Sequence, residues 1–168
     1  MSGSCGRVRA LFDAHALFPR YAPAMAVNPV PEGYSAVTPY LVVRDAPALI
    51  VFLERAFGGR ERMRMTDSTG AIRHGEVEIG DARVMLADAS EEFPPIPAML
   101  HLYVEDVDAV YRSALDAGAK SLAEPADQFY GDRMAGVRDP FGNQWWIATH
   151  FEDVSAEEAE RRQRELTG

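Results

Sequence analysis

The sequence has a single cysteine, and it has no apolar run long enough to cross a bilayer. Cys5 stands alone among 168 residues, which excludes a disulfide framework and a cysteine-based metal site. A lone cysteine fits a reducing compartment, so we expect a cytoplasmic protein. A membrane span takes about 20 consecutive apolar residues. The chain offers no such stretch, and no membrane association is expected.

Basic residues are also scarce. Lys and Arg number 17 against 26 Asp and Glu, which gives a formal net charge of −9. Nucleic-acid binding depends on a basic stripe that neutralises phosphates, so no nucleic-acid partner is expected. A negative surface instead attracts cationic ligands. The glycines form no Walker loop, and no G-x-S-x-G nucleophile motif occurs.

Residues 1–33 are predicted to be a flexible N-terminal extension. The stretch 1–24 lacks the continuous apolar core of a secretory signal, because Asp13 and Pro19 interrupt it. Met25 directly precedes a more domain-like sequence. This arrangement favours either a flexible extension or an upstream translation start, with no part in the chemistry.

An internal repeat organises the rest of the chain. "YLVVRDAPALIVFLERAFGG" begins at Tyr40, and "HLYVEDVDAVYRSALDAGAK" begins at His101. Each copy has a short apolar strand, an Asp, a stretch with helical spacing and a glycine. The carboxylates of Asp45 and Asp106 are predicted to cap the first turns of two helices. The glycines at the other end of each stretch, Gly58 and Gly118, fit the position after a helix.

Each copy continues with three strand-like segments. "ERMRM", "RHGEVEI" and "ARVMLAD" follow the first helical stretch, and "KSLAEP", "RMAGVR" and "QWWIAT" follow the second. The sequence therefore predicts an α+β fold of two βαβββ modules, at residues 34–90 and 99–150, joined by a proline-rich linker at 91–98. Residues 151–168 are predicted to form a C-terminal helix, opened by the S-x-x-E box of Ser155 and Glu158. One module exposes an apolar sheet face, so two modules must pair, within the chain or across a dimer.

These features resemble the vicinal oxygen chelate superfamily of glyoxalase I, extradiol dioxygenases, fosfomycin-resistance proteins and bleomycin-resistance proteins. The resemblance covers about residues 34–150 and is carried by "TPYLVV", "LHLYVEDVDAVYRSALDAGA" and "VRDPFGNQWWIAT". With "FYGDR" and "RHGEVEIGDARVMLAD", the chain is most similar to the PhnB-like branch. The resemblance implies glyoxalase-like paired sheets that curl around a cavity. Members often form homodimers, so a homodimer is expected.

Metal-using members of this superfamily place ligands on the first and last strands of each module. In this sequence those places fall near Tyr40, Val84, His101 and Trp146. The alignment defines the position at Val84 only to within one residue. Only His101 is an ordinary ligand for a divalent ion, whereas a catalytic site takes about three protein ligands. The resemblance therefore implies that the usual metal site is absent and that no cofactor is needed.

Strand alternation defines a second set of polar candidates. In "HGEVEI", His74, Glu76 and Glu78 share the face opposite Val77 and Ile79. His74 and Glu76, with His101 from the other module, could form a rebuilt divalent metal site, since histidine and carboxylate suit zinc, nickel or manganese. The alternatives are a metal-free acid–base pair and a plain polar patch on a wetted sheet.

The remaining candidates are aromatic or lie in a loop. Adjacent Trp145 and Trp146 must point to opposite faces. The resemblance implies that Trp146 is the one that faces the cavity, where it is either a platform for a planar ligand or part of the core packing. Tyr103 shares a face with His101. The loop "QFYGDR" adds Tyr130 and Arg133 beside a glycine, and such loops often carry binding residues.

We therefore predict a small-molecule-binding protein without the superfamily's metal, acting by ligand sequestration or resistance. The ligand-binding residues are predicted to be Tyr40, Glu76, Tyr103, Tyr130, Arg133 and Trp146. An aromatic cavity in an acidic protein suits a planar or cationic organic molecule. The alternative is a lyase or isomerase that uses His74 or His101 as a general base.

Overall fold

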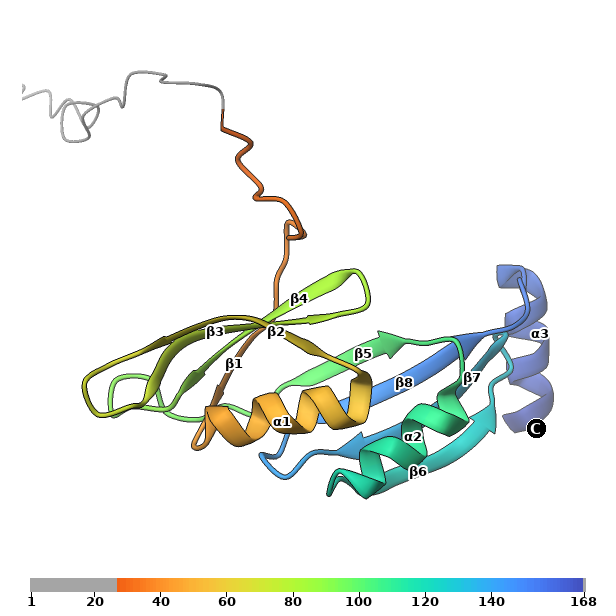
Figure 1. Ribbon diagram of the computed structural model, residues 1–168. Coiled ribbons are helices and arrows are strands. Elements are labelled where there is room, and N and C mark those ends of the chain that lie inside the picture. Colours follow the sequence, from red (N-terminus) through yellow and green to blue (C-terminus); the bar gives the residue numbers. More distant parts are fainter. Residues whose placement is uncertain (1–26, 168) are drawn as a thin grey trace, which may run out of the picture.

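The computed structural model describes residues 27–167 as two consecutive βαβββ modules followed by a helix (Figure 1). The first module contains β1 (Tyr40–Val43), α1 (Ala46–Phe57), β2 (Arg60–Thr66), β3 (Ile72–Ile79) and β4 (Ala82–Asp88). The second contains β5 (Met99–Tyr103), α2 (Val107–Asp116), β6 (Lys120–Asp127), β7 (Asp132–Arg138) and β8 (Gln144–His150), and α3 (Ala156–Thr167) ends the chain. Cys5, Met25 and most of the predicted extension lie outside the described residues.

Each module folds into its own four-stranded sheet. The strand orders are β1-β4-β3-β2 and β5-β8-β7-β6, so the two halves repeat one topology. The first strand of each module runs parallel to the last, and the other neighbours are antiparallel. The predicted α+β class and the repeated βαβββ order are confirmed.

Local signals fix the helix ends as the sequence predicts. The Asp45 carboxylate accepts a hydrogen bond from the backbone N–H of Ala48 at 2.9 Å, and that of Asp106 accepts one from Ala109 at 3.0 Å. Each bond satisfies an N–H group that has no partner inside the helix. Gly58 follows α1 with a φ of 66°, which lets its backbone N–H reach back to the carbonyl of Glu54.

The two modules meet through their helices. Figure 1 shows α1 and α2 side by side along the same side of the two sheets, and they pack against each other. Phe57 at the end of α1 contacts Trp145 of β8, with 4.7 Å between ring centroids. Apolar side chains from both helices and from the sheet faces beneath them form one continuous core, which includes Leu41, Leu49, Leu53, Val77, Leu86, Val107, Val137, Trp145 and Ile147.

The opposite face of each sheet carries neither α1 nor α2, and we call these two surfaces the open faces. In residues 27–167, no strand of one sheet packs against a strand of the other. The expected enclosed cavity between two curled sheets is therefore not formed within one chain. The physical reason is that α1–α2 packing joins the modules on their helix sides, which leaves both open faces uncovered.

The C-terminal helix is held against the loop before β7. Ser155 Oγ accepts a hydrogen bond from the backbone N–H of Glu158, but the Glu158 carboxylate pairs with Arg161 and Arg162, so the capping box is only half formed. Arg162 also pairs with Glu152. Within the described part of the chain, none of the helices is both long and apolar enough to span a membrane.

Candidate functional site

The open face of the first sheet is built by alternation along β1, β3 and β4. Tyr40 lies opposite Met85 in the parallel β1–β4 pair, and Met85 lies opposite Glu76 of β3. Val84, one residue earlier, is buried on the helix side. The prediction near Val84 was therefore one residue out, because β4 directs Met85 and not Val84 to the open face.

A buried carboxylate lies at the centre of this face. Glu76 is only 2% exposed, and it receives a hydrogen bond from Arg83 at 2.7 Å while His74 Nε2 lies 3.2 Å from its other oxygen. Burial would raise the pKa of Glu76, but the contacts with Tyr34, His74 and Arg83 outweigh burial and hold that pKa below its usual value. Glu76 is therefore a charged, fully engaged group.

His74 also links this carboxylate to the first strand. Tyr40 Oη lies 3.4 Å from His74 Nδ1, and the two rings are tilted with centroids 5.9 Å apart. Burial raises the pKa of Tyr40, so its phenol stays protonated at neutral pH. Tyr40 also lines a pocket of about 540 Å³ together with Arg73 of β3 and Phe93 of the linker. Three predicted site residues, Tyr40, His74 and Glu76, thus form one connected cluster.

Trp146 occupies the open face of the second sheet. It lies opposite His101 of β5 and opposite Gly136 of β7. A Cβ placed on Gly136 would come within 2.8 Å of the Trp146 ring and within 3.1 Å of two further ring atoms. The indole therefore lies flat across the glycine backbone. Trp145 points the other way, is 2% exposed, and donates its indole N–H to Asp139 at 3.1 Å.

A second buried carboxylate lies at the far end of the same face. Asp132 is 4% exposed, accepts a hydrogen bond from the Tyr103 hydroxyl at 3.0 Å, and lies 2.6 Å from His150 Nδ1. The hydrogen bond to Asp132, with a smaller contribution from Asp153, raises the pKa of His150. Asp132 likewise raises the pKa of Tyr103. The Tyr103 ring also lies against the His101 ring, with 4.8 Å between the centroids and an angle of 55° between the planes.

His150 was not among the residues predicted from the sequence. The period of two along β8 places it on the same face as Trp146, so the alternation rule could have found it. The sequence alone does not identify the side chain that His150 contacts. Asp132 lies 18 residues earlier and meets His150 only because the β7–β8 register pairs them.

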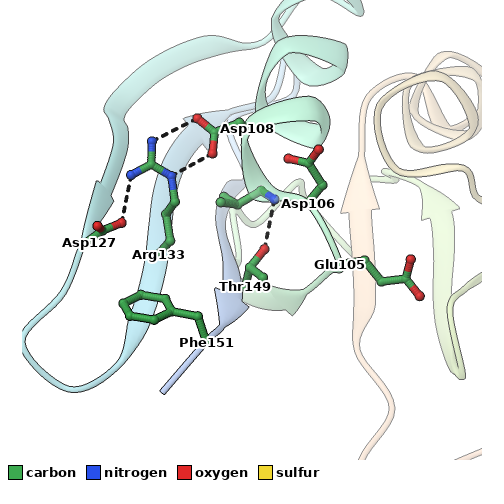
Figure 2. Close-up of a pocket in the computed structure, with 8 residues that line it drawn as sticks. Glu105, Asp106, Asp108, Asp127, Arg133, Thr149 and Phe151 are labelled. Carbon is green, nitrogen blue, oxygen red and sulfur yellow. Dashed lines mark hydrogen bonds and ion pairs between the residues drawn. The ribbon is translucent and has the colours of Figure 1, made fainter. Parts of the chain in front are cut away.

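The loop candidates divide between two sides of the sheet. The Tyr130 hydroxyl contacts Met134 Sδ at 3.5 Å, next to the network around Asp132. Arg133 points to the helix side, where it pairs with Asp108 of α2 at 2.7 Å and with Asp127 at 2.8 Å. Figure 2 shows the Arg133 guanidinium between these two carboxylates in a pocket beside α2. Arg133 is thus not gathered with Trp146 and Tyr103.

The part of the chain that the structure describes does not assemble a set of divalent-metal ligands. The four structurally equivalent positions hold Tyr40, Met85, His101 and Trp146, and a thioether or an indole is no ligand for a hard or borderline divalent ion. His74 and Glu76 belong to the first sheet and His101 to the second. In residues 27–167, no three His, Cys, Asp or Glu side chains come together as a metal-binding group.

Comparison with known proteins identifies the family of this chain. Residues 34–147 match the family model of the glyoxalase/bleomycin resistance protein/dioxygenase superfamily. The chain belongs to this superfamily. An uncharacterized protein of Mycobacterium tuberculosis, Rv0887c, is 35% identical over 145 residues, which are 80% of this chain and 83% of that protein.

Several solved structures superpose on most of the chain. TioX from Micromonospora sp. ML1 is 27% identical, with a TM-score of 0.61, over 70% of this chain and 99% of its own. TnmS3, an antibiotic binding protein from Streptomyces sp. CB03234, is 23% identical, with a TM-score of 0.56, over 75% of this chain and 98% of its own. A PhnB protein from Bacillus cereus has the same fold, at 16% identity and a TM-score of 0.56 over 68% of this chain and 99% of its own.

Proposed function

We propose that this protein binds a small planar organic molecule, without a metal ion, on the open face of the second sheet. The observation that carries the proposal is the Trp146 indole lying flat on Gly136. One ring face is held by the backbone of β7. No aromatic ring of residues 27–167 stacks on the other. A rigid, flat ring gives a planar ligand a large contact area at little entropic cost.

A second copy of the chain completes the site in this proposal. Both open faces carry large apolar side chains in contact with solvent, among them Met65, Met99 and Tyr103. Uncovered apolar surface of this kind is typical of an interface. The modules cannot cover each other within one chain, because they are joined through α1 and α2. A homodimer that stacks an open face of one copy on an open face of the other would enclose the ligand between them.

Sequestration is the biological role that fits such a site. TnmS3 has this fold and is described as an antibiotic binding protein. A metal-free aromatic cavity, acting in a reducing cytoplasm, could hold a drug-like molecule in the same manner. Resistance by binding, without turnover, is therefore the proposed role.

The alternative of a lyase or isomerase with His74 or His101 as general base finds less support. That reading needs His74, Glu76 and His101 to converge on one substrate atom. The two histidines lie on different sheets, and each is engaged by an aromatic neighbour, Tyr40 or Tyr103.

The test is titration calorimetry with naphthalene carboxamide, a neutral planar probe. We expect a Kd near or below about 1 mM for a probe of this size. Trp146→Ala should weaken binding by about tenfold or more, because stacking of a ring on an aromatic platform is lost. Trp145→Phe is the control, since Trp145 faces the core and should leave the Kd unchanged. Equal affinity in all three proteins would refute the proposed site.

A further inference from the structure

We infer that the ligand bound on Trp146 is an anionic aromatic molecule, such as an aromatic carboxylate or phenolate, and that Arg138 is its charge partner. The inference rests on the proposed function and names the chemical class of its ligand. It departs from the cationic ligand that the net charge of the whole chain favours.

The open faces reverse the charge of the rest of the protein. The strand register and the ion pairs place five cationic side chains on these faces, namely Arg60, Arg62, Arg83, Lys120 and Arg138. They place three carboxylates there, namely Glu76, Glu78 and Asp132. Glu124 lies in the irregular part of β6, and counting it still leaves a positive excess. The chain as a whole carries −9, so the positive excess is local to the two open faces taken together. On the second sheet, where the ligand is proposed to bind, Lys120 and Arg138 stand against Asp132, and counting Glu124 makes the two signs equal there.

Every one of these three carboxylates already has a partner. Glu76 is engaged by Arg83 and His74, and Glu78 pairs with Arg62. Asp132 is engaged by Tyr103 and His150. A cationic ligand would find no free carboxylate among them. It would instead be repelled by the cations that remain.

On the second sheet, where the ligand is proposed to bind, Lys120 and Arg138 are the cations left without a partner. They lie directly opposite each other in the antiparallel β6–β7 pair, and like charges in that position destabilise a sheet. Within residues 27–167 neither makes an ion pair. An anion bound between them would relieve this repulsion, which is a reason independent of the overall count to expect a negative group here.

Arg138 is also correctly placed relative to the platform. It lies two residues beyond Gly136 on β7 and on the same face, which is about 7 Å along the strand from the centre of the Trp146 contact. An arginine side chain reaches that far, and its guanidinium binds a carboxylate through two parallel hydrogen bonds. A planar ring on Trp146 with a carboxylate at its rim would satisfy both residues at once.

The test compares three naphthalene probes that differ only in charge, namely the carboxylate, the carboxamide and the methylammonium. Calorimetry should rank the carboxylate first, about tenfold tighter than the carboxamide, with the methylammonium weakest. Arg138→Gln should reduce carboxylate affinity to that of the carboxamide and leave carboxamide affinity unchanged. Arg164→Gln, at an exposed position on α3, is the matched control and should change neither.

The outcomes separate the two proposals. All three probes could depend on Trp146 and yet bind equally, or the methylammonium could bind best. Either result would overturn the proposal of an anionic ligand but would support Trp146 as the binding site. If no probe depends on Trp146, the proposed function itself fails, and this inference fails with it. A carboxylate preference that survives Arg138→Gln would overturn Arg138 as the charge partner.

Discussion

The indole of Trp146 rests on the backbone of Gly136, close enough that a single added carbon would meet the ring at 2.8 Å. Gly136 does not have a positive φ. The glycine is therefore required by close approach and not by backbone conformation. The contact fixes the plane of the ring on the open face, and everything proposed for the ligand depends on that plane.

Gly136→Ala should tilt the indole away from the sheet. We expect a loss of about 1–3 kcal/mol in the free energy of unfolding from overpacking, together with weaker binding of naphthalene carboxamide. Gly75→Ala is the matched control. Its added Cβ would meet Leu86 at 2.9 Å on the helix side of β3, so it should cost similar stability without changing the affinity. Equal affinity in wild type and Gly136→Ala would show that the plane of the ring is unimportant.

His150 should make stability depend on pH. Asp132, and then Asp153, raise the pKa of His150 above its ordinary value of 6.5. The folded protein thus holds this proton more tightly than the unfolded chain. The resulting stability is complete below pH 6.5 and is lost as the pH rises through the raised pKa.

The measurement is denaturant unfolding of wild type and His150→Gln across a pH series. The difference in free energy of unfolding should be largest at acid pH and should shrink as the pH rises. Asp153→Asn should reduce the pH dependence less than Asp132→Asn, because Asp132 contributes more to the shift. A difference that does not vary with pH would contradict this account of the ion pair.

The proposed homodimer predicts a strong effect of charge on the open face. Met99 is 70% exposed on β5, and Met99→Glu should convert the dimer to monomer in sedimentation experiments, because a charged carboxylate would replace an apolar side chain in the buried interface. Val51 is 45% exposed on α1. Val51→Glu, on the helix side, is the control and should remain dimeric. A wild-type protein that is monomeric at high micromolar concentration would remove the dimer from the proposal.

The residues at the four superfamily metal positions predict that the protein retains no divalent ion. After stripping with chelator, loading separately with Ni²⁺, Zn²⁺, Mn²⁺ or Fe²⁺ and desalting, elemental analysis should find no stoichiometric metal, and His101→Ala should behave like wild type. Stoichiometric retention of one metal that His101→Ala abolishes would show a site rebuilt around new ligands. That result would favour the lyase or isomerase over metal-free ligand binding.

The repeat made the fold predictable, because each half carries its own caps and its own strand periodicity. Asp45 and Asp106 identified both helix starts. Alternation placed Trp145 and Trp146 on opposite faces, and the resemblance to the superfamily indicated that Trp145 is the one in the core. Local patterns of this kind are short in sequence, so one sequence suffices to find them.

The features that could not be predicted from the sequence depend on distances between the two modules or on the register of strand pairing. The offset at Val84 arose because the two halves differ in length by one residue, and only the pairing of Tyr40 with Met85 resolves it. The orientation of Arg133 depended on two carboxylates, from α2 and β6, that no local pattern connects to it. The uncovered state of the open faces follows from helix–helix packing, which periodicity alone does not determine.

The equivalent pairs Tyr40–Met85 and His101–Trp146 show that the two halves keep one geometry but not one chemistry. A two-fold dimer that stacks the first sheet of each copy on the second sheet of the other would enclose a ligand compartment between each pair of sheets. Each compartment would have the Met85 thioether on one wall and the Trp146 indole on the other. Such an assembly has two identical compartments and therefore a capacity of one molecule per chain. A tethered pair of aromatic groups long enough to span both compartments would then occupy one dimer and would not crosslink two.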